Sequence, residues 1–314
     1  MTLLYYDPIF MEHQTGEHPE RPARLLSVMR HLSFMGLDSA CVRPAWEPAS
    51  IEQLAYVHTA DHIERVRSVA AAGGGQLDAD TIVSKRSFEV ARLSAGAVCD
   101  SVRRVLAGED QTALCLVRPP GHHATADLAM GFCLFNNVAI GARTAIREFG
   151  IGRVLIIDFD VHHGNGTQAI FWEDPQVGFF SMHRSAFYPG TGAADECGGG
   201  AGLGATLNVP VSFGTPPEEQ LDTFSQTVRR FAEHIRPQLV MVSAGFDAHR
   251  DDPIGSLGLV SDDFRKLTRV ILEIAAQYAD GHLVSVLEGG YNAEALANCV
   301  EAHLKELLAG AEID

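Results

Sequence analysis

Four short apolar runs constrain this 314-residue chain more than any other feature. Each is unbroken and rich in aliphatic residues, which is typical of strands buried on both faces of a parallel sheet. Amphipathic segments lie between them, for example at residues 217–235 and 261–278, and the second opens with Ser261 as its expected N-cap. This alternation predicts one α/β domain over residues 1–314, with helices on both faces of the sheet. The runs are 113–117 (ALCLV), 153–157 (RVLII), 239–243 (LVMVS) and 283–287 (LVSVL). The glycine-rich segments 73–75 and 198–204 are expected to be flexible loops.

Every one of these runs continues directly into polar residues. Ligands of parallel α/β sheets bind beyond the carboxyl ends of the strands, so these residues are expected to meet at one edge. Buried carboxylates and imidazoles cost several kcal/mol unless they are paired or bound to a metal. The edge is therefore predicted to hold a functional site. Its residues are His122 and His123 after the first run, Asp158, Asp160, His162 and Asn165 after the second, Asp247 after the third, and Glu288 and Tyr291 after the fourth.

A metal site is predicted from the spacing in the second segment. Successive side chains of an extended chain alternate in direction, so Asp158, Asp160 and His162 face one side. Asp160 and His162 can reach one ion together, and Asp247 can supply a third ligand. Two carboxylates and one imidazole leave a position open, as a catalytic zinc site requires, and the set also suits Fe(II) or Co(II). Taken alone, the segment from Asp158 to His162 also fits the hydrogen-bonded end of a strand. Taken alone, Asp247 also fits a helix cap or a turn.

The histidine pair and the tyrosine are candidates for proton chemistry. His122 and His123 follow Pro-Pro-Gly, and each is expected to have its own partner because neighbouring residues point apart in an extended chain. A neutral imidazole there can take a proton from water, and a phenol such as Tyr291 can stabilise a developing oxyanion. The alternatives are a surface turn for the histidines and an ordinary core or surface position for the tyrosine.

The composition narrows the class of partner. The chain carries 40 acidic and 24 basic residues, a formal charge of −16, which disfavours nucleic acid and favours small cations or lysine-rich peptides, unless the charge serves solubility alone. We see no signal peptide and no apolar stretch long enough for a membrane span, so no membrane partner is expected. The six cysteines form no C-x-x-C pair and suit a reducing compartment, which predicts a cytoplasmic location.

The residues at this edge, together with strings that run through the whole chain, resemble the histone deacetylase family, including its bacterial deacetylase-like amidohydrolases and acetylpolyamine amidohydrolases. The residue choices at Asn165 and in the string LEGGYN resemble those of the class II branch of this family. The strings are HxxGxHPERP (13–22), RPPGHHA (118–124), GFCxFNN (131–137), DFDVHHGNGT (158–167), FYPGTG (187–192), SAGFD (243–247) and LEGGYN (287–292).

The resemblance implies a central parallel sheet of about eight strands and a set of site roles. It implies one catalytic Zn²⁺ held by Asp160, His162 and Asp247. It also implies that His123 is the general base and later the acid, that His122 is the charge-stabilising imidazole backed by Asp158, and that Tyr291 donates to the scissile carbonyl. Asn165 stands behind His123 where other members carry an aspartate, so His123 is expected to be less basic here.

The resemblance further implies a substrate tunnel and a structural monovalent cation. The tunnel would be lined by Gly131, Phe132, Tyr188 and Ile254. Polyamine-selective relatives carry a glutamate where Ile254 follows Asp-Pro. The cation, K⁺ or Na⁺, would be bound by Asp158, Asp160, His162, Ser181 and Met182.

The function expected is therefore that of a zinc-dependent amidohydrolase removing acetyl or related acyl groups from an amine. An acetylated lysine of a protein or peptide is the expected substrate, and an acetylated polyamine is the alternative. An arginase-like metallohydrolase and a non-catalytic acyl-lysine binder are remote alternatives. The segments 12–20, 73–86 and 193–204 would decide the substrate, Asp78 or Asp80 is expected to be a rim carboxylate, and a homo-oligomer is an open possibility.

Overall fold

A parallel sheet of seven strands forms the centre of the computed structural model, which describes residues 1–310. The order is β1-β4-β9-β8-β5-β6-β7, and all six pairings are parallel. The predicted parallel α/β sheet is confirmed, with seven strands rather than about eight. All four apolar runs are strands in it. The strands are β1 (Thr2–Tyr5), β4 (Thr112–Cys115), β5 (Val154–Asp158), β6 (Val177–Arg184), β7 (Thr206–Val211), β8 (Leu239–Ala244) and β9 (Leu283–Leu287).

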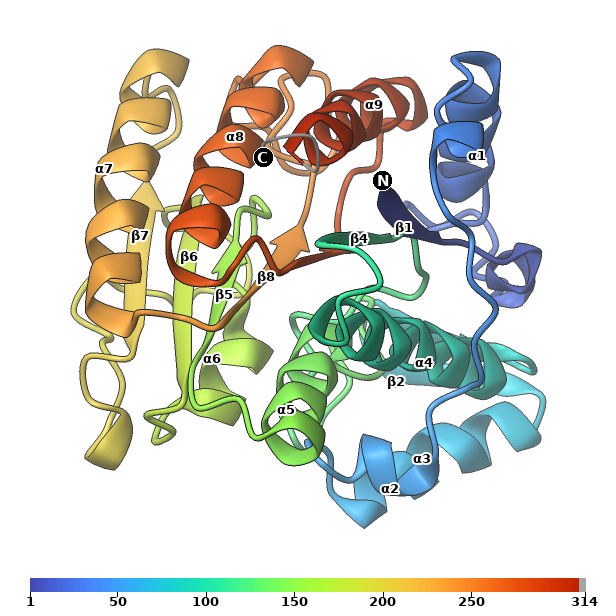
Figure 1. Ribbon diagram of the computed structural model, residues 1–314. Helices are drawn as coiled ribbons and strands as arrows, with labels where there is room; N and C mark the ends of the chain where they lie inside the picture. The colour runs from blue at the N-terminus through green and yellow to red at the C-terminus, as the bar shows by residue number, and fades with distance from the viewer. Residues whose placement is uncertain (311–314) are drawn as a thin grey trace.

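Helices cover both faces of the sheet, as the alternation of apolar runs and amphipathic segments predicts (Figure 1). One face carries α1 (Ala23–Phe34), α7 (Pro217–Ile235), α8 (Ser261–Tyr278) and α9 (Ala293–Gly310). The other carries α4 (Ser87–Leu106), α5 (Asn137–Phe149) and α6 (Asn165–Phe171), with α2 (Ile51–Leu54) and α3 (Ala60–Ala71) beyond them. Three short 3-10 helices, Pro8–Glu12, Asp38–Ala40 and Gly200–Gly202, complete the helices of the described chain.

Both amphipathic segments named from the sequence are helices with the predicted bounds, but the cap of α8 differs. The N-cap is Val260 rather than Ser261. The carboxylate of Asp263 accepts a hydrogen bond from the backbone N–H of Val260 at 3.0 Å. An acidic residue in the first turn therefore satisfies the helix start in place of the expected hydroxyl.

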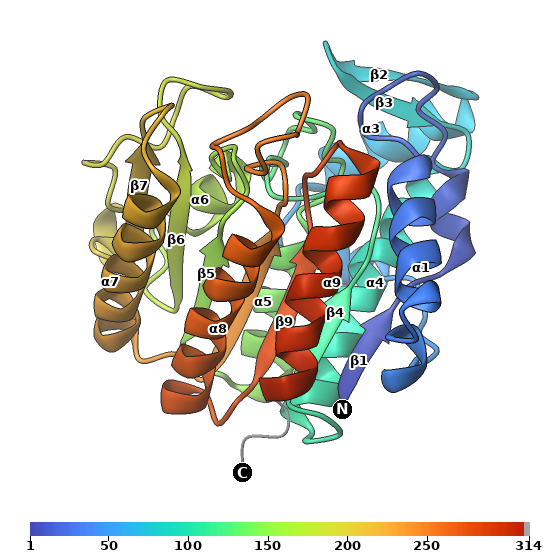
Figure 2. The same ribbon diagram turned by 90° about the horizontal axis from the view of Figure 1, so that it is seen from above.

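A two-stranded antiparallel hairpin lies apart from the main sheet. It consists of β2 (Gly74–Asp78) and β3 (Thr81–Ser84), so the prediction that residues 73–75 form a flexible loop is wrong for Gly74 and Gly75. The hairpin rises at the end of the molecule toward which the strands of the main sheet point (Figure 2). A second, smaller apolar core supports it, and includes Val83 of β3, Ile63 and Val66 of α3 and Phe135.

No helix within residues 1–310 is long and apolar enough to cross a membrane. Four of the six cysteines, Cys99, Cys115, Cys133 and Cys299, are buried as free thiols.

Candidate active site

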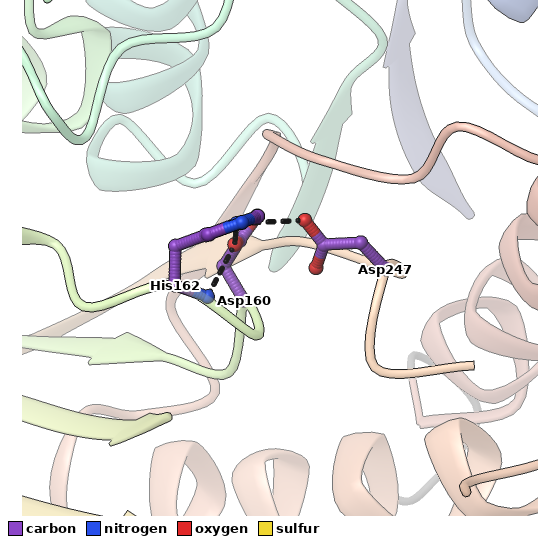
Figure 3. Close-up of side chains that lie close together, drawn as sticks. All are labelled: Asp160, His162 and Asp247. Atoms are coloured by element: carbon purple, nitrogen blue, oxygen red, sulfur yellow. Dashed lines mark hydrogen bonds and ion pairs between the residues drawn. The ribbon is translucent and has the colours of Figure 1, made fainter. Parts of the chain in front are cut away.

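Three residues that lie far apart in the sequence converge beyond the carboxyl ends of β5 and β8. Asp160 and His162 lie on the segment after β5, and Asp247 lies on the segment after β8 (Figure 3). One donor atom from each lies within 4.8 Å of the others, and all three side chains are buried. Phe159 and Val161, which alternate with them, are buried in the apolar core. The alternation read from the sequence therefore describes this segment correctly.

The charges of these three residues fit a divalent cation. Nδ1 of His162 lies 3.0 Å from Oδ1 of Asp160 and 3.1 Å from Oδ2 of Asp247. The Asp247 oxygen is buried and has no well-aligned hydrogen-bond partner. Burial and the neighbouring charge of Asp160 raise the pKa of Asp247 to about 7. Two carboxylates thus compete for one imidazole, and a bound cation would satisfy both. The oxygen and nitrogen donors suit zinc.

Two glycines leave room for these carboxylates. A Cβ atom on Gly245 would overlap Oδ2 of Asp160, and one on Gly289 would overlap Oδ2 of both Asp160 and Asp247. The backbone N–H of Gly289 also donates to Oδ2 of Asp160 at 2.9 Å. The close approach of backbone to the candidate ligands explains why the sequence has glycine at both positions.

His122 and His123 lie side by side in a turn, with ring centroids 4.0 Å apart. They are not in extended chain, yet each has its own partner as predicted. Nδ1 of His122 is 3.0 Å from Oδ2 of Asp158, a carboxylate that is fully buried. Burial lowers the pKa of His122, but Asp158 and Asp160 outweigh this effect and raise it to about 10. His122 is therefore protonated at neutral pH.

His123 has the opposite environment. Its Nδ1 lies 2.7 Å from Oδ1 of Asn165, an oxygen that can only accept, so Nδ1 carries the hydrogen and Nε2 keeps its lone pair. The amide nitrogen of Asn165 donates to the sulfur of Met130, which fixes the orientation of the amide. Burial and the nearby His122 and His162 hold the pKa of His123 well below its usual range. A neutral imidazole with one free nitrogen lies beside the three candidate ligands.

Tyr291 approaches the same point from the segment after β9. Its ring packs edge-on against Phe132, with centroids 5.7 Å apart, and the guanidinium of Arg24 lies 4.9 Å from the ring centre. Burial and the charge of Asp247 raise the pKa of the phenol well above its usual value. The phenol therefore keeps its proton at neutral pH and can act as a hydrogen-bond donor.

The comparisons with known proteins agree with this geometry. A family model described as the histone deacetylase domain matches residues 18–307. A histone deacetylase-like amidohydrolase of Pseudomonas aeruginosa is 41% identical over 293 residues, covering 93% of this chain and 76% of that protein. A probable deacetylase of Archaeoglobus fulgidus is 37% identical over 294 residues, covering 93% and 81%. The crystal structure of the HDA15 HD domain superimposes with a TM-score of 0.92 at 36% identity, covering 98% of this chain and 91% of that one.

The chain belongs to the histone deacetylase family. Membership indicates a hydrolytic enzyme, and it accounts for the sequence strings found along nearly the whole chain.

In this member of the family, two of the residues expected to line the tunnel lie against His123. Tyr188 packs edge-on against His123, with ring centroids 5.2 Å apart. Gly131 has a positive φ of 54°, and a Cβ there would overlap the ring of His123. Phe132 lies opposite, between Tyr291 and His18. Ile254 is partly buried in the turn that follows Asp252.

Asp78 and Asp80 of the β2–β3 hairpin are the two candidates for the expected rim carboxylate. Burial raises the pKa of Tyr188, and the charges of Asp80 and Asp78 raise it further, so both carboxylates lie near this tyrosine. Asp78 is exposed and Asp80 is half-buried, with its backbone carbonyl 3.1 Å from His18 Nε2.

The residues expected to bind a monovalent cation are neighbours. Asp158 of β5 pairs directly with Ser181 of β6, and Met182 follows it. The hydroxyl of Ser181 lies 2.9 Å from Nδ1 of His183. The cation itself stays a prediction.

Sequence reasoning missed a buried ionic network behind Tyr291. Glu20, fully buried, receives hydrogen bonds from Arg118, one of them from Nη2 at 2.7 Å, and from Nη1 of Arg24 at 3.1 Å. Arg24 also donates to the carbonyls of Gly290 and Glu288 at 2.6 Å each. The signal in the sequence is the i,i+4 spacing of Glu20 and Arg24, but Arg118 lies 98 residues from Glu20.

The sequence places Glu288 directly after the strand β9, but it does not show which groups this carboxyl binds. Its Oε2 accepts hydrogen bonds from the backbone N–H groups of Gly121 and His122 at 2.6 and 3.2 Å. Burial raises the pKa of Glu288 to about 7. The carboxyl group therefore holds the turn that presents both histidines.

Proposed function

We propose that this chain is a zinc-dependent deacetylase that hydrolyses the acetyl amide of a lysine side chain in a protein or peptide. The observation that carries the proposal is the convergence of three donor residues, a neutral imidazole and a protonated phenol at one edge of the sheet. Residues 1–314 would act as one catalytic domain.

Asp160, His162 and Asp247 would hold the metal. When bound, Zn²⁺ would act as a Lewis acid toward the amide carbonyl and the attacking water.

Each of the remaining roles falls to a side chain of known geometry. Nε2 of His123 would take a proton from the attacking water and later return it to the leaving amine. The phenol of Tyr291 would donate to the carbonyl oxygen as negative charge develops on it. His122, protonated and paired with Asp158, would supply a fixed positive charge beside the reacting atoms.

One feature favours a lysine side chain over a polyamine. Phe132 and Tyr188 would flank a tunnel for the methylene chain that both substrates share. Ile254 stands where polyamine-selective relatives carry a glutamate. The exposed Asp78 and half-buried Asp80 would contact the substrate at the mouth.

The deciding experiment compares kcat/KM for an acetyl-lysine peptide and for an acetylated polyamine on zinc-loaded protein, with a chelated control. We expect the peptide to be preferred by about tenfold or more, with activity lost on chelation. A preference for the polyamine would instead indicate an acetylpolyamine deacetylase that acts in small-molecule metabolism. No turnover of either substrate by the loaded protein would refute it.

A second test addresses the phenol. Tyr291→Phe should lower turnover by roughly two orders of magnitude, the usual effect of losing one oxyanion donor. Tyr278→Phe is the matched control, because within residues 1–310 its hydroxyl has a hydrogen bond only with the surface residue Gln277. Near-normal turnover in the Tyr291 variant would remove this residue from the mechanism.

We also propose that K⁺ or Na⁺ binds near Asp158 and Ser181, as a structural ion. Replacing K⁺ by a large organic cation should lower the unfolding temperature. An unfolding temperature that does not respond to either ion would contradict this site.

A further inference from the structure

Asp252 is a buried carboxylate with an unusual set of partners. Its side chain accepts four backbone hydrogen bonds and forms no ion pair with any described residue. Oδ1 accepts from Ile254 and Gly255 at 2.9 and 3.0 Å, and Oδ2 accepts from Tyr291 and Asn292 at 2.7 and 3.3 Å. Four N–H donors can hold one carboxylate in its charged form without a cation. One side chain therefore joins two loops that lie about forty residues apart in the sequence.

The first of these loops is attached to the candidate ligand Asp247. The backbone N–H of Ser256 donates to the carbonyl of Asp247 at 2.7 Å. Gly255 lies so close that a Cβ would overlap the same carbonyl oxygen. The carbonyl of Gly255 is held in turn by Nη1 of Arg184 at 2.9 Å. Oδ1 of Asp252 thus holds the turn at Ile254 and Gly255, and this turn is bound to the segment that carries Asp247.

The second loop carries Tyr291. Its earlier residues are held by other groups: the carbonyl of Gly289 accepts from the N–H of Phe246, and the carbonyl of Gly290 accepts from Arg24. The backbone N–H of Tyr291 itself has Asp252 as its acceptor. Gly290 has a φ of 119°, a backbone conformation that residues with a side chain rarely adopt. The carbonyl of Gly290 and the N–H of Tyr291 belong to one peptide plane, so Arg24 and Asp252 hold its two sides and together set the direction of Tyr291.

We propose that Asp252 is a positioning residue that fixes the phenol of Tyr291 relative to the metal-ligand segment and to the tunnel residue Ile254. This inference rests on the proposed function, because it takes Tyr291 as the oxyanion donor. A displacement of about 1 Å in such a group costs up to about a hundredfold in rate. We call the four backbone hydrogen bonds to the Asp252 carboxylate the Asp252 clip. Loss of this clip should therefore lower kcat and leave metal binding intact.

The test is a double-mutant cycle between Asp252→Asn and Tyr291→Phe. Asparagine keeps the size of the side chain but turns a hydrogen-bond donor toward one pair of N–H groups, which breaks half of the clip. We expect Asp252→Asn to lower kcat by about ten- to a hundredfold with wild-type Tyr291. In the Tyr291→Phe background the same change should cost less than about threefold, because the phenol it positions is already gone. Asp251→Asn is the matched control, since that neighbouring carboxylate is 60% exposed and, among residues 1–310, forms ion pairs only with His249 and Arg250.

Two measurements accompany the cycle. Metal content by elemental analysis should equal that of the wild-type protein. Amide hydrogen exchange on the wild-type protein should show slow exchange at Tyr291, although this residue lies outside the helices and strands of the described chain. The exchange measurement decides the contact even where the Asp252 variant does not fold.

The outcomes separate this inference from the proposed function. Equal losses of kcat in both backgrounds, loss of metal from Asp252→Asn, or fast exchange at the Tyr291 amide would each overturn the positioning role. Absence of turnover in the zinc-loaded wild-type protein would instead overturn the proposed function, and the exchange result would still report on the clip.

Discussion

Replacing Glu20 by glutamine removes one negative charge from between two buried guanidinium groups. The carboxylate of Glu20 is fully buried, and Arg118 and Arg24 bind it with the distances given above. Burial raises the pKa of this carboxyl, but Arg118, His13 and Arg24 outweigh burial and lower it from 4.5 to about 2. The folded state therefore binds this proton much more weakly than the unfolded chain does.

Two independent estimates give the loss of unfolding free energy expected for Glu20→Gln. A shift of this size, at about 1.4 kcal/mol for each pKa unit, corresponds to about 3 kcal/mol of unfolding free energy at neutral pH. Breaking a buried ion pair by removing one partner typically costs about 3–5 kcal/mol. The two agree, so we expect Glu20→Gln to lower the free energy of unfolding by about 3 kcal/mol at pH 7.

The pH dependence makes the test specific. Because the folded pKa of Glu20 is depressed, its contribution is complete above the unfolded value of 4.5 and is lost as pH falls toward about 2. The difference between wild-type and variant in urea unfolding should thus shrink to about 1 kcal/mol at pH 3. Glu17→Gln, at an exposed carboxylate of the same loop, is the control and should show no difference at either pH. A wild-type-to-variant gap that is the same at pH 7 and pH 3 would refute the electrostatic reasoning.

Two glycine substitutions should separate metal binding from base catalysis. Gly289→Ala places a methyl group against the carboxylates of the metal site, so metal affinity should fall by about tenfold or more, as measured by competition with a chelating dye. Gly131→Ala places its methyl group against the ring of His123, so kcat should fall by about tenfold or more while metal content stays normal. Gly152→Ala, whose Cβ would meet only a flexible side chain, should change neither quantity. Loss of metal from the Gly131 variant, or full metal affinity in the Gly289 variant, would contradict these assignments.

Four neighbouring strands of the sheet, β4, β9, β8 and β5, and the candidate ligands could be predicted from the sequence because both depend on local patterns. Short unbroken apolar runs are consistent with buried strands, and the two-residue spacing of Asp160 and His162 puts both on one side of an extended chain. The direction of parallel strands then brings Asp247 to the same edge without further information. These predictions needed no knowledge of contacts between distant residues.

The groups that position the site could not be predicted in this way. Asp252 and Glu288 act through backbone N–H groups on other loops, and any residue type could supply those donors. Arg24 lies four residues after Glu20, but Arg118, the other partner of Glu20, lies 98 residues away, so no spacing rule connects it to the pair. The cap of α8 was misread because a hydroxyl at Ser261 and a carboxylate at Asp263 are equally good candidates, and only the backbone path decides between them.

The balance of buried charge gives an independent reason to expect a divalent cation. Asp158 is matched by protonated His122, and Glu20 is matched by its arginines. Asp160 and Asp247 are two buried carboxylates that share the imidazole of His162, and Nε2 of His122 lies 3.9 Å from Asp160. Two buried carboxylates that share one imidazole cost several kcal/mol unless one takes up a proton or both bind a cation. The pKa of about 7 at Asp247 reflects the first of these choices, and a dication with an imidazole ligand fulfils the second while returning the site to neutrality.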